Sequence, residues 1–424
     1  MNTTLFVEPK VTSVKKFYFL EYFYILLKSV KQFSNKDEIF ESFRVYKDGF
    51  QLGESKYKKL GSTGEELTRE RLLRYEYTFK EVIEESELYG LIKRKQDEYF
   101  ITKEGDDLIR KYETNVEDFN FSIFNFIESK LFGFYYLVSS CYKANRSKQG
   151  LLIFPIYSPP KLDIQKKQIT KTKDVINYIN VLTKKIAQDI NEHLDIQADL
   201  NSAKDNLISK LQSAELISES LEAGFNTENY NVILKRIRDF WLSYFLNEVY
   251  KIQMSISYFD IWCYRGRQLG IMNATEFYYN FDGKIIYPIS ILSQGVSNPD
   301  FKNIYQYPDG NCLYIHSPKF DNIIEQFTKS VYESYIDLKS RYKTYFINLA
   351  DLRDLVCFKL KISYENFASF LENLYQLNLR NEVKIKISLE GDKLPSETKA
   401  MYLKREPIMV DGRICNIIAV DIKK

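Results

Sequence analysis

The sequence predicts a mainly helical protein of the α+β class with small β hairpins, and three observations carry this prediction. Apolar residues recur every three or four positions over much of the 424-residue chain, as they do in amphipathic helices. Short polar turns separate pairs of short apolar runs, as they do in hairpins. Hydrophobic residues make up 45% and charged residues 28% of the chain, a balance typical of globular domains rather than of disorder.

The N-terminal stretch has the pattern of three helices. Ser13 is a suitable N-cap for a helix over Val14–Phe33, in which apolar residues recur at helical spacing. A short helix over Asp37–Arg44 and a longer one over Glu65–Tyr89 follow it. We therefore expect three consecutive helices before the first strand.

A hairpin follows the third of these helices. A glycine ends the helix, and the short strands Leu91–Lys93 and Tyr99–Ile101 then flank a polar turn. Thr102 is expected to cap a helix over Lys103–Tyr112. This order of helix, glycine, hairpin and capped helix resembles the third helix and wing of a winged-helix domain. The resemblance implies such a domain over residues 1–115.

Residues 116–228 are expected to form a helical linker region. An aromatic-rich helix over Phe119–Tyr142 precedes the apolar run Leu151–Tyr157. Residues 170–222 then carry an apolar stripe on two long helices, with a break at Asp195–Asp199. The stripe fits either a bundle within one domain, or a spacer or partner-binding helix pair, and both interpretations stay open.

Residues 229–318 repeat the pattern of the first domain. A helix over Asn231–Lys251 is followed by a second helix that ends at Gly270. Asp282-Gly283 then lies between two apolar strands, which is a strong hairpin signal. This stretch therefore predicts a second winged-helix-like unit.

The C-terminal part, residues 319–424, carries the fullest set of signals. It predicts helices over Phe320–Tyr342, Leu349–Leu360 and Ser363–Leu377, an alternating strand over Val383–Leu389, a long loop over Glu390–Lys404, and a hairpin with a type I′ turn at Asp411-Gly412. This succession also resembles a winged helix. We therefore expect winged-helix domains at both ends of the chain, separated by a helical spacer.

The sequence offers no catalytic, metal or cofactor site. The two histidines lie far apart and have no Cys or His neighbour at ligand spacing. Neither a Gly-rich phosphate loop nor a G-x-S-x-G elbow occurs. A metal-dependent nuclease is a third interpretation, which rests on the Glu-x-Lys strings at Glu382–Lys384 and Glu397–Lys399. We expect a protein that is not an enzyme and has no cofactor.

Composition also indicates a compartment. Five scattered cysteines indicate buried free thiols in a reducing environment. The first residues lack the apolar core of a signal peptide, and no apolar run reaches the roughly 18 residues of a membrane span. The sequence predicts a cytoplasmic protein with no membrane partner.

Basic residues at the expected third helix and wing suggest contact with DNA. In a winged helix the third helix enters the major groove and the wing lies along the backbone, where exposed Lys and Arg contact phosphates. The candidates are Arg69, Arg71, Arg74, Lys93, Arg94, Lys95, Arg265 and Arg267.

The last domain has a different charge pattern. It offers Lys359, Lys361, Lys384 and Lys386, but its expected third helix carries Glu365 and Glu372 and no Lys or Arg. Two carboxylates without a cation would repel phosphate. This domain therefore predicts a protein-interaction module.

Two classes of function fit these features. The first is a scaffold or accessory subunit that bridges partner proteins, such as an ATPase or a nuclease, and DNA. The plan is similar to kleisin-type and associated winged-helix subunits of chromosome-structuring complexes and to accessory subunits of bacterial anti-phage or anti-plasmid systems. The second is a stand-alone DNA-binding regulator or replication or recombination factor. The net charge of only +3 favours the first, and the basic first hairpin favours direct DNA contact.

Overall fold

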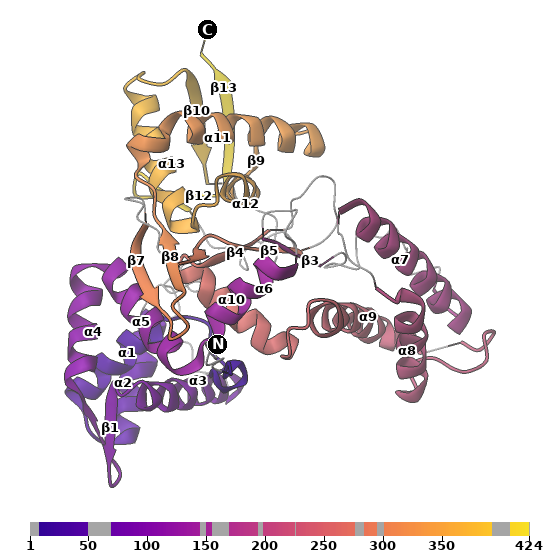
Figure 1. Ribbon diagram of the computed structural model, residues 1–424, viewed down its shortest axis with the longest axis horizontal. Coiled ribbons are helices and arrows are strands. Elements are labelled where there is room, and N and C mark those ends of the chain that lie inside the picture. The colour runs from indigo at the N-terminus through magenta and orange to yellow at the C-terminus, as the bar shows by residue number, and fades with distance from the viewer. Residues whose placement is uncertain are drawn as a thin grey trace. The chain divides into compact units, whose positions relative to one another are not determined.

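Helices predominate in the protein, and the strands form small antiparallel sheets of two or three strands (Figure 1). The mainly helical α+β class is thereby confirmed. The computed structural model describes residues 8–49, 69–144, 150–154, 169–193, 198–224, 226–275, 284–294, 301–391 and 408–423.

The chain divides into two compact units, each built from separate stretches of sequence. The first unit comprises Met1–Tyr136, Ile261–Asn273 and Ile289–Lys424, and the second comprises Leu137–Asp260 and Ala274–Pro288. The stretch 229–318, which the sequence suggested as one domain, is shared between the two units.

The first unit begins with three helices, a hairpin and a fourth helix. They are α1 (Glu21–Gln32), α2 (Lys36–Gly49), α3 (Arg69–Leu88), β1 (Ile92–Lys95), β2 (Glu98–Ile101) and α4 (Lys103–Thr114). Thr102 caps α4 as predicted, because its side-chain oxygen accepts a hydrogen bond from the backbone N–H of Gly105. Asn35, just before α2, forms an antiparallel bridge with Glu98 of β2. The start of α2 is therefore fixed to the hairpin.

The segment that precedes α1 differs from the prediction. Residues 14–20 are not part of the helix, which begins at Glu21, and Val11–Ser13 form only a short 3-10 turn. Ser13 is therefore not the N-cap of α1. The prediction of a helix over Val14–Phe33 is therefore wrong for its first seven residues.

Side chains of a distant helix hold this segment in its non-helical course. They lie three residues apart on α10 (Ile256–Gln268) and so share one face of that helix. Each donates a hydrogen bond to backbone carbonyls of the segment: Trp262 to Val11, Arg265 to Lys15 and Phe17, and Gln268 to Tyr18. These carbonyls of the segment have hydrogen-bond donors on α10 and do not need helical ones. The spacing of apolar residues alone therefore predicted a helix that does not form.

The aromatic-rich stretch predicted as one helix forms two, α5 (Val116–Leu131) and α6 (Gly133–Ala144). Phe132 lies between them with a left-handed φ of 51°, which ends α5. A Cβ atom on Gly133 would lie 2.3 Å from the ring of Trp262, so this position has room only for glycine. The break is set by packing against a residue far along the chain.

The end of the chain forms three helices and a small sheet. The elements are α11 (Phe320–Tyr342), β9 (Ile347–Asn348), α12 (Leu349–Leu360), α13 (Tyr364–Leu379), β10 (Ile385–Glu390), β11 (Ile408–Val410), β12 (Arg413–Cys415) and β13 (Ile417–Ile422). Strand β13 lies between β10 and β9 in one antiparallel sheet, and β11 and β12 form a separate hairpin.

Two local predictions in this region are confirmed. Ser363 caps α13 by accepting a hydrogen bond from the N–H of Asn366 at 2.9 Å. Asp411 and Gly412 have φ values of 53° and 68°, and a type I′ turn needs positive φ at both positions. Most of the expected long loop, from residue 392 onward, lies outside the described residues.

A further sheet of the first unit was not predicted. Its order is β6–β8–β7, formed by Ile291–Ser293, Cys312–His316 and Phe301–Gln306. The turn between β7 and β8 contains Pro308-Asp309-Gly310, a strong turn sequence that could have predicted the hairpin.

The second unit contains the predicted helix pair. Its helices are α7 (Thr172–His193), α8 (Leu200–Ser213) and α9 (Tyr230–Tyr244), with a π-helical turn over Phe245–Val249, and its strands β3 (Leu152–Phe154) and β5 (Lys284–Pro288) pair. In the sheet order, β4 (Met272–Thr275) is the neighbour of β5. The apolar stripe of α7 and α8 is buried, but α8 ends at Ser213 and does not reach Leu221, which is exposed. The expected turn at Asp282-Gly283 lies outside the described residues.

Candidate nucleic-acid interface

The β1–β2 hairpin holds three consecutive cations at the surface. Lys93, Arg94 and Lys95 are all exposed, whereas Ile92 and Tyr99 are buried and anchor the hairpin. In Figure 1 the hairpin extends past the ends of the surrounding helices. The structure therefore gathers these three candidates at one accessible place.

Among the described residues, the partners of the hairpin cations are weak. Arg94 forms an ion pair with Asp97 at 3.0 Å, and both side chains are more than half exposed. This hydrogen bond raises the pKa of Arg94. The Nζ atom of Lys95 lies 5.9 Å from the centre of the Phe100 ring. Exposed pairs of this kind contribute little to stability, so the side chains can turn toward an external anion.

The candidates on α3 lie away from the hairpin. Arg69 and Arg74 are exposed near the start of the helix, and Arg71 is helical but its side chain lies outside the described residues. At a rise of about 1.5 Å per residue, Arg74 lies roughly 20 Å along the axis from the end of α3 at Leu88. The arginines near the start of α3 and the cations of the β1–β2 hairpin therefore form two separate basic patches on this domain.

Most carboxylates near the end of α3 have hydrogen-bond or ion-pair partners within the protein. Glu84 pairs with the ammonium group of Lys15, and a carboxylate oxygen of Glu81 accepts the backbone N–H of Lys16 at 2.7 Å. Glu85 is buried in an ion pair with Arg265. These partners reduce the repulsion that the carboxylates would exert on a DNA backbone.

Arg265 does not fit its predicted role. Its side chain and that of Glu85 are both 0% exposed, and they form two hydrogen bonds of 2.6 and 2.8 Å. Burial alone would lower the pKa of Arg265, but the adjacent carboxylate more than offsets this and raises it. A guanidinium group enclosed in this way cannot contact a phosphate, so the proposal of DNA contact at Arg265 is withdrawn.

Arg267 is held between two aromatic rings of the first unit. Its guanidinium group lies 4.4 Å from the ring centre of Tyr264 and 5.2 Å from that of Tyr364. The side chain is half-buried. This cation–π contact gives Arg267 a structural role and makes it a weaker candidate than the hairpin cations.

The lysines of the C-terminal region are dispersed over its surface. Lys384 and Lys386 lie exposed on and next to β10, Lys359 is exposed at the end of α12, and Lys361 is half-buried against the Phe358 ring. The outer face of α13 carries Glu365, and Glu372 accepts the N–H of Asp411 at 2.6 Å. This arrangement provides no basic face on α13.

Sequence reasoning missed a buried carboxylate at the α5–α6 junction. Glu128 accepts hydrogen bonds from the N–H groups of Phe134 and Tyr135 and from the hydroxyl of Tyr307. Its burial raises its pKa to about 7. The donors come from the start of α6 and from the β7–β8 turn, so only the folded chain brings them together.

The described residues contain no group of three or more His, Cys, Asp or Glu side chains placed to hold a metal ion. All five cysteines are free and buried, as predicted. Within the part of the chain that the structure covers, no helix is both long and apolar enough to cross a membrane. No family model, curated protein or solved structure matches this chain.

Proposed function

We propose that this chain is a non-enzymatic protein with a winged-helix domain at each end, which joins a DNA backbone to a protein partner as an accessory subunit of a larger complex. The N-terminal order of helix, bridge, helix, helix, hairpin and helix supports the first winged helix. The C-terminal order of helix, strand, helix, helix, strand, hairpin and strand supports the second, with its last strand between the other two.

The observation that carries the DNA part of the proposal is the exposed cluster Lys93, Arg94 and Lys95 at a wing. Three adjacent cations on a projecting hairpin suit the phosphate contacts that wings make. The C-terminal domain is assigned to a protein partner, because the outer face of α13 has no cation. An ATPase or nuclease of a bacterial anti-phage, anti-plasmid or chromosome-structuring complex is the partner class that the family resemblance suggests.

A salt-dependent DNA titration tests this proposal. The protein is titrated into a fluorescent random duplex at two salt concentrations, alongside the variant Lys93→Ala/Arg94→Ala/Lys95→Ala. We expect weaker binding by the variant and a salt slope lower by roughly 0.9 for each lost phosphate contact. The matched control is Lys130→Ala/Lys319→Ala/Lys329→Ala, which removes three exposed cations from elsewhere in the first unit.

The outcomes separate the two classes of function. Equal loss in both variants would show a general charge effect and remove the wing from the interface. Binding of one duplex sequence far above random duplex would favour a stand-alone regulator. No binding at low salt would refute the DNA part of the proposal and leave a protein scaffold.

A further inference from the structure

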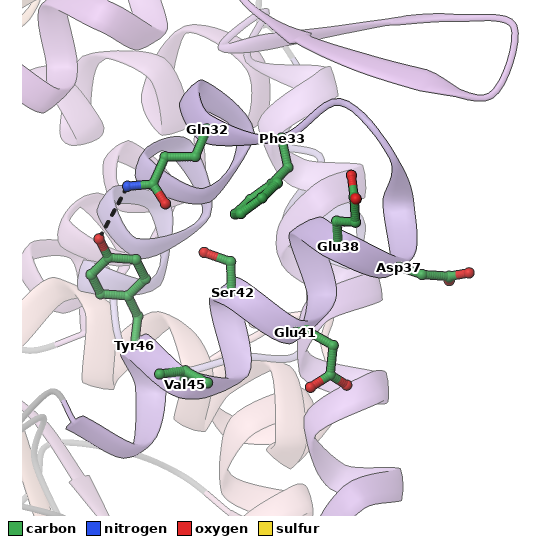
Figure 2. Close-up of a pocket in the computed structure, with 8 residues that line it drawn as sticks. All are labelled: Gln32, Phe33, Asp37, Glu38, Glu41, Ser42, Val45 and Tyr46. Atoms are coloured by element: carbon green, nitrogen blue, oxygen red, sulfur yellow. Dashed lines mark hydrogen bonds between the residues drawn. The ribbon is translucent and has the colours of Figure 1, made fainter.

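The N-terminal domain has a groove on the side of α2, which we call the acidic groove. Its volume is about 960 Å³, and it is lined by Gln32, Phe33, Asp37, Glu38, Glu41, Ser42, Val45 and Tyr46. Figure 2 shows that the residues come from the end of α1 and from one side of α2. The groove is shallow and open to solvent.

The floor of the acidic groove is apolar and accessible. Phe33 is 39% exposed and Val45 is 63% exposed, although both are large hydrophobic residues. Figure 2 shows Phe33 pointing from the end of α1 toward Ser42 of α2, with Tyr46 joined to Gln32 by a 3.4 Å hydrogen bond at one end. An apolar side chain placed here would be removed from water on the side that faces Phe33 and Val45.

Three carboxylates line the same groove. Asp37, Glu38 and Glu41 come from the first two turns of α2, and all three are exposed. Arg44 pairs with one of these carboxylates, that of Glu41, along the helix. The charge of the groove is therefore negative, which excludes a phosphate backbone and favours a cationic occupant.

We propose that the acidic groove binds a basic amphipathic helix of a protein partner, with large apolar side chains against Phe33 and Val45 and Lys or Arg side chains beside the three carboxylates. Helices lie in grooves of this kind with apolar anchors at positions i, i+3, i+4 and i+7. The proposal names the partner chemistry of the scaffold function above and rests on it. The lining of the groove does not include the hairpin cations Lys93, Arg94 and Lys95.

The test measures the anisotropy of a fluorescent synthetic helix of leucine and lysine, with leucines at i, i+3, i+4 and i+7. Two further peptides serve as controls. One is a shuffled sequence of the same composition, and the other is an acidic analogue with Glu in place of Lys. We expect the basic amphipathic peptide to bind at least ten-fold more tightly than either control.

Protein variants locate the binding site. Val45→Asp should weaken binding at least ten-fold, whereas the matched change Val181→Asp, at a 56% exposed valine of α7, should not. Glu38→Lys/Glu41→Lys should weaken binding of the basic peptide and improve binding of the acidic analogue. Thermal unfolding of each variant checks that it is folded.

Three results would overturn the inference. They are absence of binding by the basic peptide, equal binding of the shuffled peptide, and unchanged binding by both groove variants. Duplex binding is measured on the same proteins, and the groove variants should retain it while the wing variant loses it. A failure of the peptide-binding proposal can thus be distinguished from a failure of the DNA-binding proposal.

Discussion

Replacing Arg265 with methionine is expected to destabilise the first unit strongly. The substitution leaves the Glu85 carboxylate 0% exposed and without its cation. It also removes the donors to the carbonyls of Lys15 and Phe17, at 3.0 and 3.2 Å. Removing one partner of a buried ion pair costs about 3–5 kcal/mol, so Arg265→Met should lower the free energy of unfolding by this amount.

A second substitution tests the cause. Glu85→Gln/Arg265→Met removes both charges and keeps an acceptor for the hydroxyl of Tyr89, which donates to Glu85. The double variant should be destabilised by at least about 2 kcal/mol less than the sum of the two single variants. An exposed control, Arg94→Met, should change the free energy of unfolding by no more than about 0.5 kcal/mol.

The assay is urea unfolding followed by tryptophan fluorescence. The chain has two tryptophans, and Trp262 lies in the first unit, three residues before Arg265. In a Trp241→Phe background, Trp262 therefore reports unfolding of the first unit alone. A loss below about 1 kcal/mol for Arg265→Met, or additive losses in the double variant, would refute the account of a buried, mutually dependent pair.

Three further predictions use the same fluorescence assay. Burial raises the pKa of Glu128 to about 7 from 4.5, so the native state binds this proton more tightly than the unfolded chain. Stability should fall by up to about 3 kcal/mol as the pH rises from about 4.5 to about 7, and Glu128→Gln should flatten this profile; an unchanged profile would contradict the assignment. Gly133→Ala, with its Cβ against the Trp262 ring, should cost about 1–3 kcal/mol, and wild-type stability would show that the helices can shift apart. Thr102→Ala should cost about 1 kcal/mol through the lost cap of α4, while Thr102→Ser should restore most of it.

The candidate site was only partly predictable from sequence. Lys93, Arg94 and Lys95 were found because a hairpin is defined by a few adjacent residues, and three consecutive charged side chains beside a polar turn face water. Arg265 was wrongly predicted to contact DNA, because the residues next to it in sequence do not reveal its ion pair with Glu85, 180 residues away in the chain. The acidic groove was not predicted, since it needs the end of α1 beside one face of α2.

The sequence by itself determined the elements that depend on short-range interactions. The caps at Thr102 and Ser363 and the turn at Asp411-Gly412 each use hydrogen bonds or backbone preferences that span only a few residues, so local chemistry fixes them. Tertiary structure decided the course of residues 11–20, where the carbonyl of Val11 accepts a hydrogen bond from Trp262 across 251 positions of sequence. The same distant helix fixes the break before Gly133 and buries Arg265. In these places the free energy of contacts between remote segments exceeds the weak local preference for a continuous helix.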